Sequence, residues 1–209
     1  MGERFDRRQR DLLDAWRETA HARASGPEFD FTDRRHSVQL RRALEGFLDD
    51  PSEATLGPLW TTDTLRAAVV GTPKMLVRAW DSPEALASFL RTVRDAEDYD
   101  DDWEETFVSS SAAWELYGRL HPEREPILTG NACRGLQDFG YGTIRTFADG
   151  YEAMESFRED YEAAVGHVTA DTDHEVTIYE EMEAFLHRYH VLDDEELRRE
   201  SEPPEQSTE

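Results

Sequence analysis

The chain has 209 residues and a formal net charge of −24, because 47 acidic residues stand against 22 arginines and one lysine, Lys74. No run reaches the roughly 18 to 20 apolar residues of a membrane span, and a single cysteine, Cys133, excludes an internal disulfide. Repulsion between exposed like charges reaches about 10 Å at roughly 0.1 M salt but about 3 Å at molar salt. We therefore interpret the acidity as that of a cytoplasmic, haloarchaeal protein whose fold requires molar salt.

Apolar residues recur at helical spacing through the first half of the chain. They predict an amphipathic helical arm within residues 1–25, a second helix over 33–48, and a third from Thr62 or Asp63 to Gly71. Ser82-Pro83-Glu84 predicts another helix start, since proline is favoured at the first helical position. Residues 95–105 contain eight acids and predict a solvated loop.

The second half of the chain continues the helical pattern. Helices are predicted over 112–120, from Thr129 or Asn131 to Gly140, over 151–165 and over 178–189. Residues 193–209 hold eight acids, two prolines and one apolar residue, a composition typical of a disordered tail. The sequence thus predicts one all-α, orthogonal helical domain over residues 1–192, with seven or eight helices and a disordered acidic tail.

Positive charge gathers near the start of the chain. Residues 1–45 hold ten arginines and nine acids, so this segment carries +1 and residues 46–209 carry −25. The arginines either pair with acids on helix surfaces, as Asp6 and Arg10 can at i, i+4, or form a docking surface for nucleic acid or an acidic partner. The candidate nucleic-acid-binding residues are Arg7, Arg8, Arg34 and Arg35.

No residue pattern declares a catalytic or cofactor site. Lys74 lies in Gly71-Thr72-Pro73-Lys74-Met75, which lacks the second glycine and the hydroxyl of a phosphate-binding loop. Glu183, His187 and His190 share one helix face at i, i+4 and i+7, a spacing that offers metal ligands. A histidine near a helix end is, however, favourable on electrostatic grounds alone. The structural interpretation is therefore preferred, and neither a cofactor nor a metal is predicted.

The stretch from 112 to 141 resembles an element of helical regions found beside McrB-type restriction ATPases. Its landmarks are Leu120-His121-Pro122, Pro126-Ile127-Leu128, Asn131, Leu136 and Gly140-Tyr141, followed by a tyrosine-rich helix. The chain is more distantly similar to helix-hairpin-helix DNA glycosylases. It lacks their Leu-Pro-Gly-Val-Gly hairpin and a lysine nucleophile, so that resemblance would leave Asp149 as the catalytic aspartate. Asp149-Gly150 is equally a turn signal.

These observations predict a non-catalytic accessory module of a nucleic-acid-linked or defence system. DNA or RNA and an ATPase or nuclease protein are its candidate partners. Two alternatives stay open: an enzyme on a glycosylase-like scaffold, and a protein-interaction or oligomerisation domain. A concave pocket around a buried carboxylate would favour the enzyme.

Overall fold

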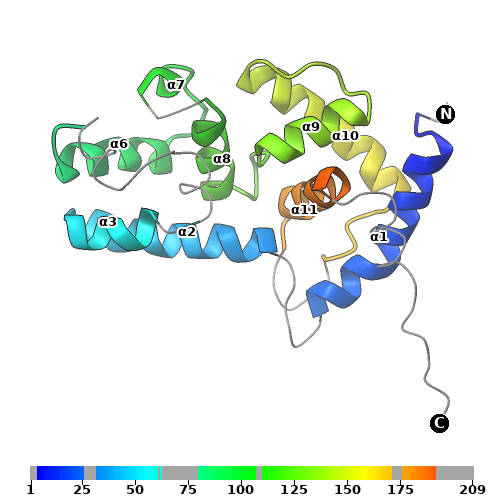
Figure 1. Cartoon of the computed structure of the whole chain (residues 1–209), viewed down its shortest axis with the longest axis horizontal. Coiled ribbons are helices and arrows are strands. Elements are labelled where there is room, and N and C mark those ends of the chain that lie inside the picture. The colour runs from blue at the N-terminus through cyan, green and yellow to red at the C-terminus, as the bar shows by residue number, and fades with distance from the viewer. Residues whose placement is uncertain are drawn as a thin grey trace, which may run out of the picture. The chain divides into compact units, whose positions relative to one another are not determined.

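The computed structural model describes residues 4–25, 32–60, 62, 80–106, 110–170 and 176–191. Within these ranges the chain forms α-helices and no strand (Figure 1). The helices are α1 (Arg7–Ser25), α2 (Thr32–Asp49), α3 (Glu53–Trp60), α6 (Pro83–Asp95), α7 (Trp103–Thr106), α8 (Ser110–Leu120), α9 (Gly130–Asp138), α10 (Phe147–Ala164) and α11 (Ile178–Val191). The prediction of an all-α fold is confirmed.

The chain divides into two compact units. Unit 1 comprises Met1–Phe31 and Asn131–Glu209, and unit 2 comprises Thr32–Gly130. Unit 1 therefore joins the first helix of the chain to its last three, whereas unit 2 is continuous in sequence. The single domain proposed over residues 1–192 stays a prediction, and the third predicted helix and the acidic tail lie outside the described residues.

Unit 1 is built around a cluster of phenylalanines. The ring of Phe139 lies edge-on to Phe5 at 5.8 Å between centroids, and to Phe157 and Phe185 at 5.6 Å. These rings come from the chain before α1, the end of α9, α10 and α11. Edge-to-face packing at this spacing is favourable beyond the area buried, so the aromatic cluster joins all four helices of the unit. The predicted arm is part of this core, because Leu13, Trp16 and Ala20 of α1 are buried.

Unit 2 packs α3, α6 and α8 against α2 (Figure 1). Each helix presents an apolar stripe at helical spacing. Its buried members include Leu40, Leu44 and Phe47 from α2, Leu56 and Leu59 from α3, Leu86, Leu90 and Val93 from α6, and Leu116 and Tyr117 from α8. The interior of unit 2 is thus mainly aliphatic, whereas that of unit 1 contains more aromatic side chains.

Local capping explains why several boundaries were predictable. Ser82 is the N-cap of α6, its hydroxyl accepts a hydrogen bond from the Ala85 amide at 3.2 Å, and Pro83 opens the helix. Gly140 and Gly142 adopt φ of 86° and 93°, the left-handed region that suits glycine, at the two positions that flank Tyr141 after the end of α9. A solvated loop is also confirmed for the acids of 97–102, which are exposed, whereas Asp95 still belongs to α6.

Three local predictions were wrong. No helix was predicted over 53–60, where the structure forms α3 with Pro58 inside it. Trp103 begins the short helix α7 and is buried, although the sequence predicts a solvated loop over residues 95–105. Asp149-Gly150 is not a turn, since α10 already begins at Phe147.

Gly118 of α8 allows a close approach between two backbone segments of unit 2. A Cβ atom there would lie 2.3 Å from the Pro126 carbonyl oxygen and 2.9 Å from the Ile127 Cα. Such a contact is well inside van der Waals distance, so α8 packs on the 126–127 segment only through a residue without a side chain.

We expect Gly118→Ala to lower the free energy of unfolding by about 1–3 kcal/mol, the usual cost of overpacking a core. Gly46→Ala is the matched control, because its new methyl group meets nothing within 4 Å. That control should gain about 0.5–1 kcal/mol from better helix propensity. Denaturant unfolding in molar KCl measures both, and equal effects would contradict the close packing at Gly118.

Candidate functional site

Two adjacent glutamates of α11, Glu180 and Glu181, have no exposed surface. Burying an ionised carboxylate costs several kcal/mol unless hydrogen bonds replace its hydration. Their surroundings therefore decide whether unit 1 holds a reactive carboxylate or a structural one.

Glu180 belongs to the start of its own helix. The Thr177 amide donates to its Oε2 at 3.0 Å, and the Glu180 amide donates to the Thr177 hydroxyl at 3.2 Å. This reciprocal pair is a capping box, which satisfies backbone donors that the first helical turn leaves open. Glu180 thus fixes where α11 begins.

Glu181 accepts hydrogen bonds on both carboxylate oxygens. Its Oε1 accepts from the Tyr161 hydroxyl at 2.6 Å and from the Val168 amide at 3.3 Å. Its Oε2 accepts from the Thr169 amide at 2.9 Å and from the Thr169 hydroxyl at 2.5 Å. One carboxylate therefore holds α10 and the segment that follows it against α11.

Tyr161 extends this network to the first helix. The indole Nε1 of Trp16 donates to the Tyr161 oxygen at 2.6 Å, while the same hydroxyl donates to Glu181. Burial and the adjacent carboxylate raise the pKa of Tyr161 well above its ordinary value. The phenol therefore stays protonated near neutral pH and remains a donor, so it links Trp16 of α1 to Glu181 of α11.

His167 is a partly exposed neighbour of this network. Its Nε2 lies 3.0 Å from the Val176 carbonyl oxygen and 3.7 Å from Glu181 Oε2. Because a carbonyl only accepts, Nε2 carries a proton and donates it to Val176. The imidazole therefore makes its short contact with the backbone, and Glu181 keeps four donors of its own. A carboxylate occupied in this way holds helices together and has no free lone pair directed at a substrate.

The predicted metal candidates are brought together in part. Glu183 is buried and its Oε1 lies 3.9 Å from Nδ1 of His187, whose side chain is 46% exposed. The side chain of His190 lies outside the described residues. Among the residues that the structure does describe, no three His, Cys, Asp or Glu side chains gather as metal ligands would.

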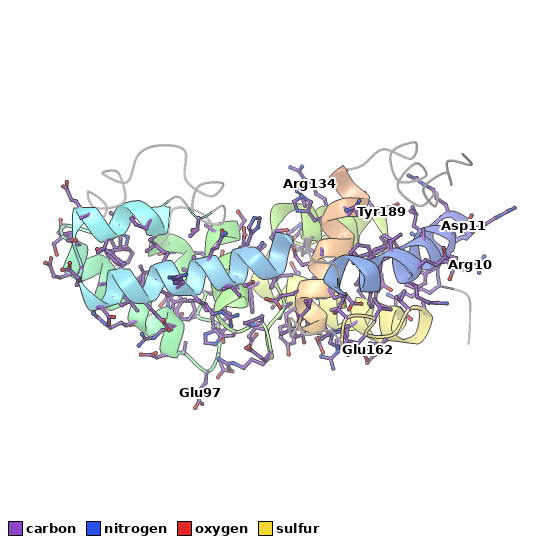
Figure 2. The ribbon with its side chains drawn as sticks, turned by 90° about the horizontal axis from the view of Figure 1, so that it is seen from below. Arg10, Asp11, Glu97, Arg134, Glu162 and Tyr189 are labelled. Atoms are coloured by element: carbon purple, nitrogen blue, oxygen red, sulfur yellow. The ribbon has the colours of Figure 1, made fainter. Side chains whose placement is uncertain are left out.

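The candidate arginines belong to different units. Arg7 and Arg8 lie on α1 in unit 1 and are exposed. The Arg8 guanidinium lies 5.8 Å from the ring centroid of Tyr189 on α11. Figure 2 labels Tyr189 on that helix. Arg34 and Arg35 lie in the first turn of α2 in unit 2, and their side chains lie outside the described part of the chain.

Arg4 is used inside unit 1. Its guanidinium lies 2.9 Å from the Asp160 carboxylate and 4.2 Å from the centroid of the Tyr141 ring. The Tyr141 hydroxyl donates to the same carboxylate at 2.7 Å. Arg4 therefore pairs with an acid, as one of the two interpretations of the basic segment predicts. Its partner is distant in the sequence, however, and is not an acid at i, i+4.

Two further residues singled out in the sequence have structural roles. Asp149 is the third residue of α10, and its carboxylate accepts from the Arg145 and Thr146 amides at 3.0 Å, which lowers its pKa. Asp149 thus completes a capping box with Thr146. Burial raises the pKa of the Cys133 thiol to about 12, so this cysteine is not a thiolate near neutral pH.

Unit 2 carries a groove of about 410 Å³ between α2 and α3. It is lined by Gln39, Arg42, Ala43, Gly46, Thr55, Pro58 and Thr62. None of these is an acid, so this groove is not the pocket around a buried carboxylate that would favour an enzyme.

No family model, no curated protein and no solved structure matches this chain. Of the helices described, none has both the length and the apolar character required to cross a bilayer. The resemblance of 112–141 to elements beside McrB-type ATPases stays a prediction.

Removing the Tyr161 hydroxyl tests the structural role of the carboxylate network. Tyr161→Phe deprives Glu181 of one donor and Trp16 of its acceptor, so we expect a loss of about 1–3 kcal/mol in unfolding free energy. Tyr151→Phe, on the exposed face of the same helix, should change stability by less than about 0.5 kcal/mol. Both are measured by denaturant unfolding, and an unchanged Tyr161→Phe would refute the role assigned to the network.

Proposed function

We propose that this chain is a non-catalytic accessory module that acts by binding, in a nucleic-acid-linked or defence system of a halophile. The observation that carries the proposal is the state of Glu181: both oxygens of this fully buried carboxylate accept hydrogen bonds from the protein itself. A carboxyl group that takes part in general acid–base catalysis must lie within reach of a substrate proton. Glu181 instead supports the helices.

Asp149 gives further support to a non-catalytic role. An aspartate that serves a glycosylase-like enzyme has to face its substrate, whereas Asp149 accepts two backbone amides at the start of α10. The enzyme alternative thereby loses the one residue that the sequence offers for its chemistry.

The proposed nucleic-acid contact is the exposed side of α1. Arg7 and Arg8 lie there, within residues 1–45, which hold ten arginines and nine acids. Phosphate binding by counterion release weakens by about 0.9 decade for each contact per decade of salt. In a halophile, binding would therefore rest on the planar fork of arginine and on shape, with few ionic contacts.

Protein interaction is the second candidate function, and the α2–α3 groove favours it. The groove presents Ala43, Gly46 and Pro58 together with one cation, Arg42, on a chain with 47 acids. Val38, on the same helix, is 46% exposed. An ATPase or nuclease subunit of the same system is the kind of partner that we propose for this surface.

Fluorescence anisotropy with duplex and single-stranded probes at roughly 0.5, 1 and 2 M KCl tests the nucleic-acid proposal. The arginine pairs are changed separately because they belong to different units: Arg7→Ser with Arg8→Ser, and Arg34→Ser with Arg35→Ser. We expect binding with a shallow salt slope, weakened at least about tenfold by the first change, which is about 1.4 kcal/mol.

A charge-matched control is Arg94→Ser with Arg145→Ser. Arg94 pairs with its neighbour Asp95 at 2.7 Å, and Arg145 is exposed beside the cap of α10. The control also removes two positive charges, but from residues outside α1. Nucleic-acid binding should therefore persist in it. Absence of binding at every salt concentration, or equal weakening by the control, would leave protein interaction as the function.

A further inference from the structure

His121 follows the end of α8 and contacts the last turn of α6. Its Nε2 lies 3.3 Å from the Val93 carbonyl oxygen, and its Nδ1 lies 3.3 Å from a terminal nitrogen of Arg124. The ring packs on Tyr117 with 4.7 Å between centroids. The imidazole is therefore held on both nitrogens and on one face.

The chemistry of the two partners fixes the protonation state of the ring. A carbonyl oxygen only accepts and a guanidinium only donates. Nε2 must therefore carry the proton and Nδ1 must be bare. Neutral His121 satisfies both contacts in this tautomer, whereas an imidazolium would direct an Nδ1 proton at the donors of Arg124.

Arg124 joins this ring to the carboxyl end of α6. Its guanidinium donates to the Ala96 carbonyl at 2.5 Å and to the carbonyl of Glu97. Ala96 is the C-cap of α6, so these bonds satisfy carbonyls that the helix end leaves open. The Tyr117 hydroxyl adds a bond to the Glu97 carbonyl at 3.0 Å. The acidic segment 96–102 begins at this point.

We propose that His121 and Arg124 form an acid-released latch on the carboxyl end of α6. Protonation of His121 at Nδ1 breaks its contact with Arg124 and places two cations side by side. The Arg124 guanidinium then moves away from the His121 imidazole, and its hydrogen bonds to the carbonyls of Ala96 and Glu97 weaken. As a result, the segment 96–102 becomes less ordered.

Burial and the charged groups around the imidazole together set the pH at which the latch is released. Burial is the largest influence and lowers the pKa of His121, as does Arg124, while Asp95 from α6 and Glu123 from the adjoining turn raise it. The neighbouring Tyr117 stays neutral, because burial and Glu125 raise its pKa to about 12. The net pKa of His121 is lowered, so the folded state binds fewer protons than the unfolded state. Stability from this contact is complete above the ordinary value of about 6.5 and is lost as the pH falls through the folded pKa.

Histidine-selective ¹⁵N NMR on the full chain in molar KCl tests the latch. At pH 8 we expect the Nε2-protonated tautomer of His121, and on acidification a midpoint below about 6.5. Backbone amide signals of 96–102 should move with the same midpoint. A different tautomer at pH 8, or amide signals that follow only the carboxylates at lower pH, would overturn the proposal.

Two variants separate this response from other titrations. His121→Gln should abolish the movement of 96–102 at the His121 midpoint, whereas His167→Gln, in unit 1, should leave it unchanged. If His121→Gln fails to fold, the His121 tautomer at pH 8 and the titration midpoint of the unaltered chain still test the proposal. Persistence of the same midpoint in a folded His121→Gln protein would refute the latch.

Discussion

Unit 1 depends on one buried carboxylate. Glu181 is excluded from water, and an ionised group in that position is tolerated only when protein donors replace its hydration shell. The donors come from Tyr161 on α10 and from the backbone and hydroxyl groups of 168–169. Through the Tyr161 hydroxyl the same network reaches Trp16, 145 positions earlier in the chain. The aromatic core supplies the burial, and the carboxylate decides how the helices are oriented within it.

Several arginines of this acidic protein make stabilising contacts within the chain. Guanidinium groups lie over tyrosine rings at Arg4, Arg8, Arg124 and Arg158 among the residues described. At Arg124 the same group also closes the end of α6 by donating to backbone carbonyls. A planar fork that stacks and donates at once cannot be replaced by the point charge of lysine. The shortage of lysine in the sequence thus has a structural counterpart.

Features that depend on neighbouring residues could be predicted from the sequence, whereas contacts between residues far apart in the chain could not. Ser82-Pro83 fixed the start of α6 because a cap and a proline act within one turn. The helix α3 contains Pro58, a residue that disfavours a helix interior, and it is held in place by the burial of Leu56 and Leu59. Glu181 could not be chosen among 47 acids, since its donors lie 12 to 20 positions away and make no motif with it. Only the capping pair beside it, Thr177 with Glu180, has a recognisable spacing.

Amide hydrogen exchange at Val168 and Thr169 tests the central role of Glu181 most directly. Both amides lie outside the helices, and the acceptor of each is the Glu181 carboxylate. The account predicts that both are protected in the unaltered protein and that Glu181→Gln, which turns one acceptor oxygen into a donor, removes that protection while the amides inside α10 exchange as before. Protection of Val168 and Thr169 that survives Glu181→Gln would contradict it.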